Sequence, residues 1–344
     1  MGTIKVLDCT LRDGGFALED AVKNNIKTEQ FGYKEREYLA RHIVNSGVEI
    51  IEIGAIEVTP EDKRGFAIYQ DMQGISSVMP QKADEKQMFA GFYRGPDIDV
   101  NTVPEKKESM LDIARVCLRY SELEKSLIFS KGLSTKGYKV FLQPMVTVRY
   151  SIEELLRVID AANDMNAYAV YFVDSYGYMN PKDIEFYYEL FDKHLKENIA
   201  IGFHAHNNME MALINVIKFL SLGTNRNVII DSCVSGMGQG TGNLQTEVIT
   251  NYLNGMHDKK YNLAEVYKAC EIVDRYNINH LWGYYVPRYI AACNRTAYKY
   301  AMSLGNHYNK GYAEIDELLS KMPEELRYRY TPENVKALLG EDKK

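Results

Sequence analysis

The sequence lacks any long apolar segment, and its longest uninterrupted apolar run is the stretch from Ala167 to Val173. A membrane-spanning helix needs about 20 such residues, so we expect no membrane span. The first residues lead directly into a strand-like pattern without the apolar core of a signal peptide, and Val6 occupies the position where a myristoylation signal has serine or threonine. We therefore expect a cytoplasmic protein.

Cysteine pairs and excess positive charge are also missing. The five cysteines are an odd number, lie far apart and include no CxxC pair, which argues against a disulfide framework and a zinc ribbon. We expect these thiols to be reduced and mostly buried. The 41 Lys and Arg residues against 47 Asp and Glu residues give a net charge of −6. Such a chain offers no favourable field to a phosphate backbone, so nucleic acid is not an expected partner.

What the chain does contain is an alternation of short apolar runs with longer helical patterns. Its 344 residues and 46% apolar content fit a packed globular protein of one or two domains. No GxGxxG motif follows the first strand pattern, and eight β-then-α units exceed the usual count of an open doubly wound sheet. We therefore predict a (β/α)8 TIM barrel. The expected strands lie near residues 3–8, 48–55, 87–93, 111–119, 138–147, 168–174, 199–205 and 227–233.

Helix signals support this alternation and continue alone beyond the eighth unit. The sequence has a capping box at 151–154 and an Asn-Pro helix start at 180–181. Later in the chain the pattern is only helical and amphipathic. The predicted organisation is a barrel over residues 1–257 that carries the active site, followed by a helical C-terminal subdomain over residues 258–344.

Two histidines, His204 and His206, end the seventh expected strand. Residues two apart on a strand share one face, so both imidazoles can point into the mouth of the barrel, where active sites of this fold lie. Asp13, after the first strand, is the natural third ligand. Two imidazoles and a carboxylate fit Mn²⁺ or Mg²⁺ best, although Zn²⁺ and Fe²⁺ also accept them. The alternative is a pair of ordinary histidines at a strand end.

Arg12 directly precedes Asp13 in an Arg-Asp-Gly-Gly turn. Its permanent charge and forked donors can bind a carboxylate or stabilise an enolate oxygen, or it can form only a salt bridge at the barrel rim. Glu52 is an acid in an otherwise apolar strand and needs a partner if buried, for which Arg12 is the obvious choice. Arg12 and Glu52 are thus catalytic candidates, and Arg12 and Gly14 are substrate-binding candidates.

Three further positions carry weaker signals. Asn243 is either a metal or substrate ligand or the cap of the following helix, and the glycines before it fit a phosphate-binding loop or a sharp turn beside the metal. Ser175, after the sixth strand, either donates to a substrate carboxylate or caps a turn. Tyr284, in a tyrosine cluster of the C-terminal part, either reaches the mouth of the barrel as a catalytic group or packs in a core.

Together these motifs resemble the DRE-TIM metallolyases, an HMGL-like superfamily that includes the HMG-CoA lyases and the isopropylmalate and homocitrate synthases. The branch of class II 4-hydroxy-2-oxovalerate aldolases, which cleave off pyruvate, is the most similar, because it is about as long and also carries a helical C-terminal part. The resemblance rests on Cys9-Thr-Leu-Arg-Asp-Gly14, Glu52, His204-Ala-His206-Asn-Asn208, the segment from Gly236 to Glu247, and the pair Gly283-Tyr284.

The resemblance implies a role for each matching residue. Asp13, His204 and His206 would bind a divalent metal. Arg12 would stabilise the enolate, Glu52 would orient Arg12, and Ser175 would contact the carboxylate of a 2-oxo acid. The aldolases also have a general-base histidine near this turn, and here that position is Phe16. Either a tyrosine or a metal-bound water then acts as the base, or the substrate differs; His280 is a weaker stand-in, because a structural role suits it better.

Three functions fit these observations. The first is a divalent-metal-dependent aldolase that acts through the enolate of a pyruvate-type 2-oxo acid and an aldehyde. The second is a Claisen-type synthase that joins an acyl-CoA to a 2-oxo acid, for which the C-terminal part is short. The third is a non-catalytic metal-binding scaffold. Because the helical tail of the aldolase family docks an acylating aldehyde dehydrogenase, the resemblance also implies such a partner, or a homo-oligomer.

Overall fold

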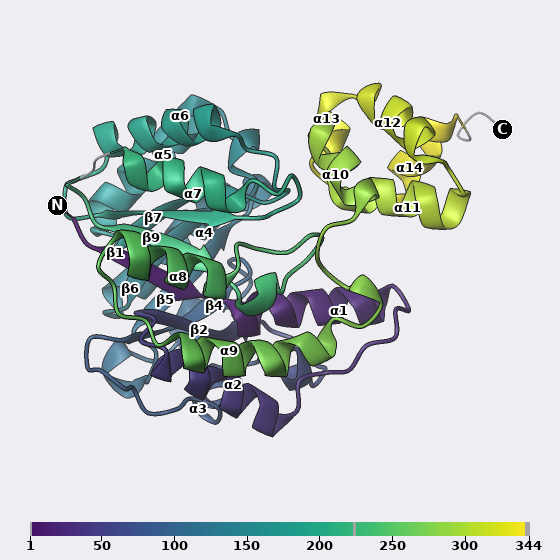
Figure 1. Cartoon of the computed structure of the whole chain (residues 1–344). Coiled ribbons are helices and arrows are strands. Elements are labelled where there is room, and N and C mark those ends of the chain that lie inside the picture. Colours follow the sequence, from purple (N-terminus) through teal and green to yellow (C-terminus); the bar gives the residue numbers. More distant parts are fainter. Residues whose placement is uncertain (1, 223–224, 341–344) are drawn as a thin grey trace.

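The computed structural model describes residues 2–222 and 225–340, and its centre is a closed barrel of parallel strands. β1 pairs with both β2 and β9, which closes the barrel, and the short strand β3 lies beside β2. The other strands coincide with the expected apolar runs to within a few residues, so the TIM-barrel prediction is confirmed (Figure 1). The strands are β1 (Ile4–Asp8), β2 (Ile50–Ile56), β3 (Ile68–Tyr69), β4 (Met88–Tyr93), β5 (Ile113–Leu118), β6 (Lys139–Pro144), β7 (Ala169–Asp174), β8 (Ala200–Ala205) and β9 (Val228–Ser232).

The barrel strands are apolar because both of their faces are covered. Every residue of β2, β4, β5, β7, β8 and β9 is buried. Side chains such as Phe141 and Tyr171 fill the interior, whereas the outward side chains pack beneath the helices. Glu52, Arg115 and Asp231 are charged exceptions within these buried strands, and they prove to support the site.

Helices cover the outside of the barrel, except between β4 and β5, where two 3₁₀ turns replace the expected helix. The capping box at Ser151 is present, because Ser151 Oγ accepts from the Glu154 N–H and the Glu154 carboxylate accepts from the Ser151 N–H. No helix in the described part of the chain combines the length and apolar character that a membrane crossing requires. The covering helices are α1 (Gly15–Lys23), α2 (Tyr33–Asn45), α3 (Met72–Ser76), α4 (Leu123–Thr135), α5 (Ile152–Met165), α6 (Pro181–His194), α7 (Ala212–Ser221), α8 (Thr246–Met256) and α9 (Leu263–Val273).

The last helices form a second packing unit on one side of the barrel, coloured yellow in Figure 1. Their buried residues, such as Tyr300 and Ile315, form a cluster of their own. Ala269 and Val273 of α9, by contrast, belong to the core of the barrel. The division at residue 258 stays a prediction, and the final four residues lie outside the described chain. The helices of this unit are α10 (Val286–Cys293), α11 (Tyr298–Tyr308), α12 (Tyr312–Ser320), α13 (Glu324–Arg327) and α14 (Pro332–Leu339).

Candidate active site

Polar side chains from the ends of several barrel strands meet in one cavity of about 360 Å³. Arg12 and Asp13 belong to a π-helical turn, Thr10–Gly14, that follows β1. Ser175 follows β7, and His204 and His206 lie at the end of β8. All of these positions are at the C-terminal face of the barrel, where the fold builds its active sites.

Asp13, His204 and His206 form the predicted ligand group. One ligand atom from each lies within 4.8 Å of the other two. His204 Nε2 and His206 Nε2 lie 3.7 and 3.9 Å from Asp13 Oδ2. Asp231 binds His204 Nδ1 at 2.9 Å, which turns Nε2 toward Asp13 in the way that outer-shell carboxylates orient metal-binding histidines. These residues therefore fit a divalent metal ion.

Asn243 lies beside this group with its amide nitrogen toward Asp13. Nδ2 donates to Asp13 Oδ2 at 2.7 Å and to the Met237 carbonyl at 3.2 Å, while the buried Oδ1 has no partner among the described residues. A half-turn of the amide would exchange the two atoms and present an oxygen to an ion beside Asp13. Gln245, not Asn243, is the cap residue of α8. The ligand role of Asn243 stays a prediction.

The charges around the site act differently on the three ligands. Burial raises the pKa of Asp13, but the Arg12 guanidinium and the two imidazoles outweigh it and hold the pKa at about 2. Burial lowers the pKa of His206 to about 4, so this imidazole is neutral near pH 7, as a ligand must be. Burial alone would lower the pKa of His204, but the hydrogen bonds of His204 with Asp231 and Cys9 outweigh burial and raise this pKa to about 10. An ion that binds His204 must displace that proton.

Arg12 is held in one orientation by two carboxylates. Nε donates to Glu52 Oε2 and Nη1 donates to Asp13 Oδ1, both at 2.7 Å. The Phe92 ring centroid lies 4.5 Å from Arg12 Cζ. Nη2 forms no hydrogen bond to any described residue, so it is available to a ligand. The expected contact between Arg12 and Glu52 is thus present.

Two charged residues that the sequence patterns did not single out support this arrangement. Arg115 is fully buried and pairs with Glu52 Oε1 at 2.9 Å and with Asp231. A chain of ion pairs therefore runs from Arg12 through Glu52, Arg115 and Asp231 to His204. The signal that identified Glu52, a charge within an apolar strand, also applies to Arg115 and Asp231.

Ser175 lines the cavity, as its predicted contact with substrate requires. Its Oγ accepts a hydrogen bond from the Val146 N–H at 2.8 Å, which leaves the hydroxyl proton free to donate. Val146 itself has φ 56° and ψ 59°, a left-handed conformation that is rare for a β-branched residue. Ser175 therefore holds a strained turn at the wall of the cavity.

Gly14 and the glycine-rich segment serve backbone packing. A Cβ on Gly14 would lie 2.4 Å from Met237 Sδ, and Gly14 does not line the cavity, so its substrate role stays a prediction. Gly242 has φ 88°, and a Cβ there would lie 1.9 Å from the Gly236 carbonyl oxygen. The backbone therefore forms the sharp turn beside the metal group, and the phosphate-binding interpretation of this segment stays a prediction.

Tyr284 does not reach the cavity. It is 56% exposed, and its ring packs 6.3 Å from that of Tyr289. His280 is also exposed. The chain returns to the cavity only at α11, where Tyr298 joins the lining. The tyrosines that line the cavity are therefore Tyr176 and Tyr298, and a catalytic role for a tyrosine stays a prediction.

Comparisons with known proteins agree with this geometry. The HMGL-like family model matches residues 3–273. The 4-hydroxy-2-oxovalerate aldolase of Pseudoalteromonas translucida (strain TAC 125) is 30% identical over 264 residues, which are 72% of this chain and 69% of that protein. The oxaloacetate decarboxylase of Mycobacterium tuberculosis (strain ATCC 25618 / H37Rv) is 26% identical over 249 residues, 71% of this chain and 68% of that protein.

The fold comparison points the same way. The solved structure of the HMG-CoA lyase from Bacillus subtilis superposes with a TM-score of 0.64 at 17% identity, covering 79% of this chain and 92% of that one. This likeness concerns the fold alone, whereas the family match covers most of the sequence. The chain therefore belongs to the HMGL-like family and is a carbon–carbon lyase.

Proposed function

We propose that the protein is a divalent-metal-dependent aldolase that forms or cleaves a carbon–carbon bond next to the enolate of a 2-oxo acid such as pyruvate. The observation that carries this proposal is the common cavity of the Asp13, His204 and His206 group and the free Nη2 of Arg12. A bound Mn²⁺ or Mg²⁺ ion would supply Lewis-acid polarisation of the 2-oxo acid. Arg12 would then neutralise charge on the enolate oxygen, and Glu52 would keep the guanidinium in position.

Ser175→Ala is expected to raise the KM for the 2-oxo acid by about tenfold or more, with a smaller effect on kcat. A hydrogen bond to a charged group contributes roughly 1.5–3 kcal/mol, and about 1.4 kcal/mol corresponds to tenfold. Steady-state kinetics would measure the change. Ser130→Ala is a matched control, because the Ser130 hydroxyl donates to the Ser126 carbonyl within α4. An unchanged KM would contradict the assignment of Ser175 to the carboxylate.

Among the described residues, no histidine or carboxylate outside the ligand group lines the cavity. The Phe16 ring centroid lies 5.7 Å from Arg12 Cζ and 4.1 Å from Arg94 Cζ, so an aromatic ring fills the place of the family's histidine. Burial raises the pKa of the Cys117 thiol to about 11, the pKa of Tyr176 to about 12 and the pKa of Tyr298 well above its ordinary value. None of these groups accepts a proton readily near pH 7. Aldol cleavage, which must deprotonate a hydroxyl, therefore lacks a strong side-chain base.

Phe16→His is expected to accelerate aldol cleavage by about 100-fold, the lower part of the range for an added general base. Arg12 and Arg94 flank this position, and their charges would favour the neutral imidazole, which can accept a proton. Pyruvate release from a 4-hydroxy-2-oxo acid would measure the rate. Phe16→Gln is polar but not basic and serves as the control. If Phe16→His left the rate unchanged, proton removal would not be limiting at this position.

The lack of a strong side-chain base in the cavity favours a second candidate, the decarboxylation of a 2-oxo dicarboxylate. Loss of carbon dioxide yields the enolate directly and needs no base for the bond to break. Arg94 also lines the cavity, but its guanidinium already pairs with Glu57 at 2.7 Å and with Glu19 at 3.2 Å, so a second substrate carboxylate would have to share it with them. The relative named oxaloacetate decarboxylase supports this alternative.

Proton NMR in D₂O separates these functions. The protein is loaded with Mn²⁺, incubated with pyruvate or acetyl-CoA, and stripped of metal before acquisition. Exchange of the pyruvate methyl protons that disappears in Asp13→Ala would support an enolate-forming lyase. Exchange of acetyl-CoA alone, with a 2-oxo acid present, would support the Claisen synthase, and no exchange of either would favour the scaffold. Release of carbon dioxide from oxaloacetate above the rate with free metal would identify the decarboxylase.

An aldehyde dehydrogenase partner or a second copy of the chain, expected from the resemblance, stays a prediction. The surface of α10 to α12 and the segment before it suits such a contact, because Tyr284, Tyr289 and Tyr312 are all exposed there. Tyrosine is enriched at protein interfaces. The cytoplasmic location likewise stays a prediction.

A further inference from the structure

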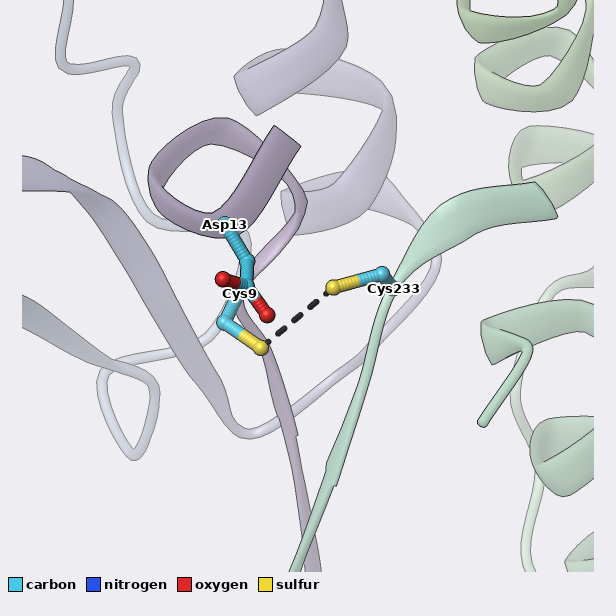
Figure 2. A group of neighbouring side chains, drawn as sticks. All are labelled: Cys9, Asp13 and Cys233. Atoms are coloured by element: carbon cyan, nitrogen blue, oxygen red, sulfur yellow. Dashed lines mark hydrogen bonds between the residues drawn. The ribbon is translucent and has the colours of Figure 1, made fainter. Parts of the chain in front are cut away.

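Two thiols lie against each other at the interior side of the metal group. Cys9 follows β1 and Cys233 follows the neighbouring strand β9. Their Sγ atoms are 3.4 Å apart, and both residues are fully buried in the cluster that fills the barrel (Figure 2). The proposed reaction uses neither thiol.

The Asp13 carboxylate completes a group of three with these thiols. One ligand atom from each of Cys9, Asp13 and Cys233 lies within 4.8 Å of the other two, and Figure 2 shows the carboxylate oxygens on the same side as the sulfur atoms. Two sulfur atoms bound to one tetrahedral zinc ion, each at about 2.3 Å, lie roughly 3.8 Å apart. The observed separation of the sulfur atoms is therefore close to that of a zinc-bound pair.

We propose that Cys9, Cys233 and Asp13 form a site for a thiophilic divalent ion such as Zn²⁺ or Cd²⁺. Thiolates prefer such ions, whereas the oxygen and nitrogen ligands of the neighbouring group suit Mn²⁺ or Mg²⁺. Each thiol loses one proton when it binds, so one ion releases up to two protons and nothing is oxidised or reduced. Asp13 lines the cavity and gives an arriving ion its first contact with the site.

Sharing Asp13 makes the two sites compete. An ion held by both thiols draws the carboxylate toward the barrel interior and away from His206. A thiophilic ion is therefore expected to displace Mn²⁺ from the Asp13, His204 and His206 group. The thiol site itself does not depend on which reaction the protein catalyses.

Cadmium titration of the metal-free, full-length protein tests the site through the thiolate-to-cadmium charge-transfer band in the ultraviolet. The band is expected to saturate at one equivalent of Cd²⁺ and to disappear in the double variant Cys9→Ser/Cys233→Ser. Loss of an outer-shell partner lowers metal affinity by up to roughly 100-fold, so loss of two direct ligands should lower the Cd²⁺ affinity by more than that. Cys117→Ser is the matched control, because Cys117 is also buried at the cavity but lies outside the group. A band that persists in the double variant, or that Cys117→Ser removes, would overturn the proposal.

X-ray absorption on the wild-type protein needs no variant and therefore no assumption about folding. With one equivalent of Zn²⁺, two sulfur neighbours at about 2.3 Å are expected. A first shell of nitrogen and oxygen alone, at about 2.0–2.1 Å, would overturn the proposal. His206→Ala disables only the other group, so the cadmium band should survive in this variant while Mn²⁺ binding weakens. The cadmium band thus reports on the thiol site alone, and Mn²⁺ binding reports on the group that the proposed function needs, so the failure of either can be recognised separately.

Discussion

Arg12→Lys is expected to slow deuterium exchange into the pyruvate methyl group by about 100- to 1,000-fold, the effect of removing one donor to a developing oxyanion. Arg12 uses Nε for Glu52 and Nη1 for Asp13, which leaves Nη2 for the substrate. A lysine ammonium has no planar fork and cannot hold both carboxylates and still present a fixed third donor. The loss should therefore fall mainly on kcat.

The measurement compares exchange rates at saturating Mn²⁺, with Mn²⁺ affinity determined separately by electron paramagnetic resonance. Arg119→Lys is the matched control, because Arg119 lines the same cavity but already donates to Asp97, Glu122 and the Arg94 carbonyl. It should exchange at nearly the wild-type rate. An Arg12→Lys enzyme within about tenfold of wild type would show that the enolate is stabilised without the guanidinium fork.

The parts of the site that the sequence predicts correctly depend on local periodicity. His204 and His206 face one way because they are two apart on a strand, and Asp13 lies at a strand end because the apolar run stops just before it. Each of these conclusions needs only a few neighbouring residues. The same reasoning located the eight barrel strands, whose apolar runs are buried on both faces.

The parts that the sequence does not predict depend on contacts made by closure of the barrel or by the path of the tail. Cys9 meets Cys233 only because β1 pairs with β9, across more than 200 residues of chain. Tyr298, at the start of α11, lines the cavity, whereas Tyr284, just before α10, is 56% exposed. No periodicity in either segment contains that information.

Arg115 is fully buried between the carboxylates of Glu52 and Asp231, in the middle of the chain of ion pairs that joins Arg12 to His204. Arg115→Met is expected to lower the free energy of unfolding by about 3–5 kcal/mol, because Glu52 and Asp231 would lose their shared cation in the barrel interior. Urea unfolding would measure the change, provided that the dependence of the free energy of unfolding on urea concentration is the same in both proteins. Arg64→Met is the matched control, since Arg64 forms an exposed ion pair with Asp62 and such pairs contribute about 0–1 kcal/mol.

The pH dependence of this loss identifies its cause. In the wild-type protein burial raises the pKa of Asp231, but Arg115 and His204 outweigh burial and lower it. Without Arg115 the folded protein would hold a proton more tightly on this carboxyl than the unfolded chain does. When the pKa of a group is higher in the folded protein than in the unfolded chain, the free energy of unfolding falls as the pH rises from the unfolded pKa to the folded pKa. The deficit of Arg115→Met should therefore be larger at pH 7 than at pH 4, which is close to the unfolded value of about 3.9. A deficit that is equal at both pH values would point to lost packing around the arginine stem instead of an uncompensated charge.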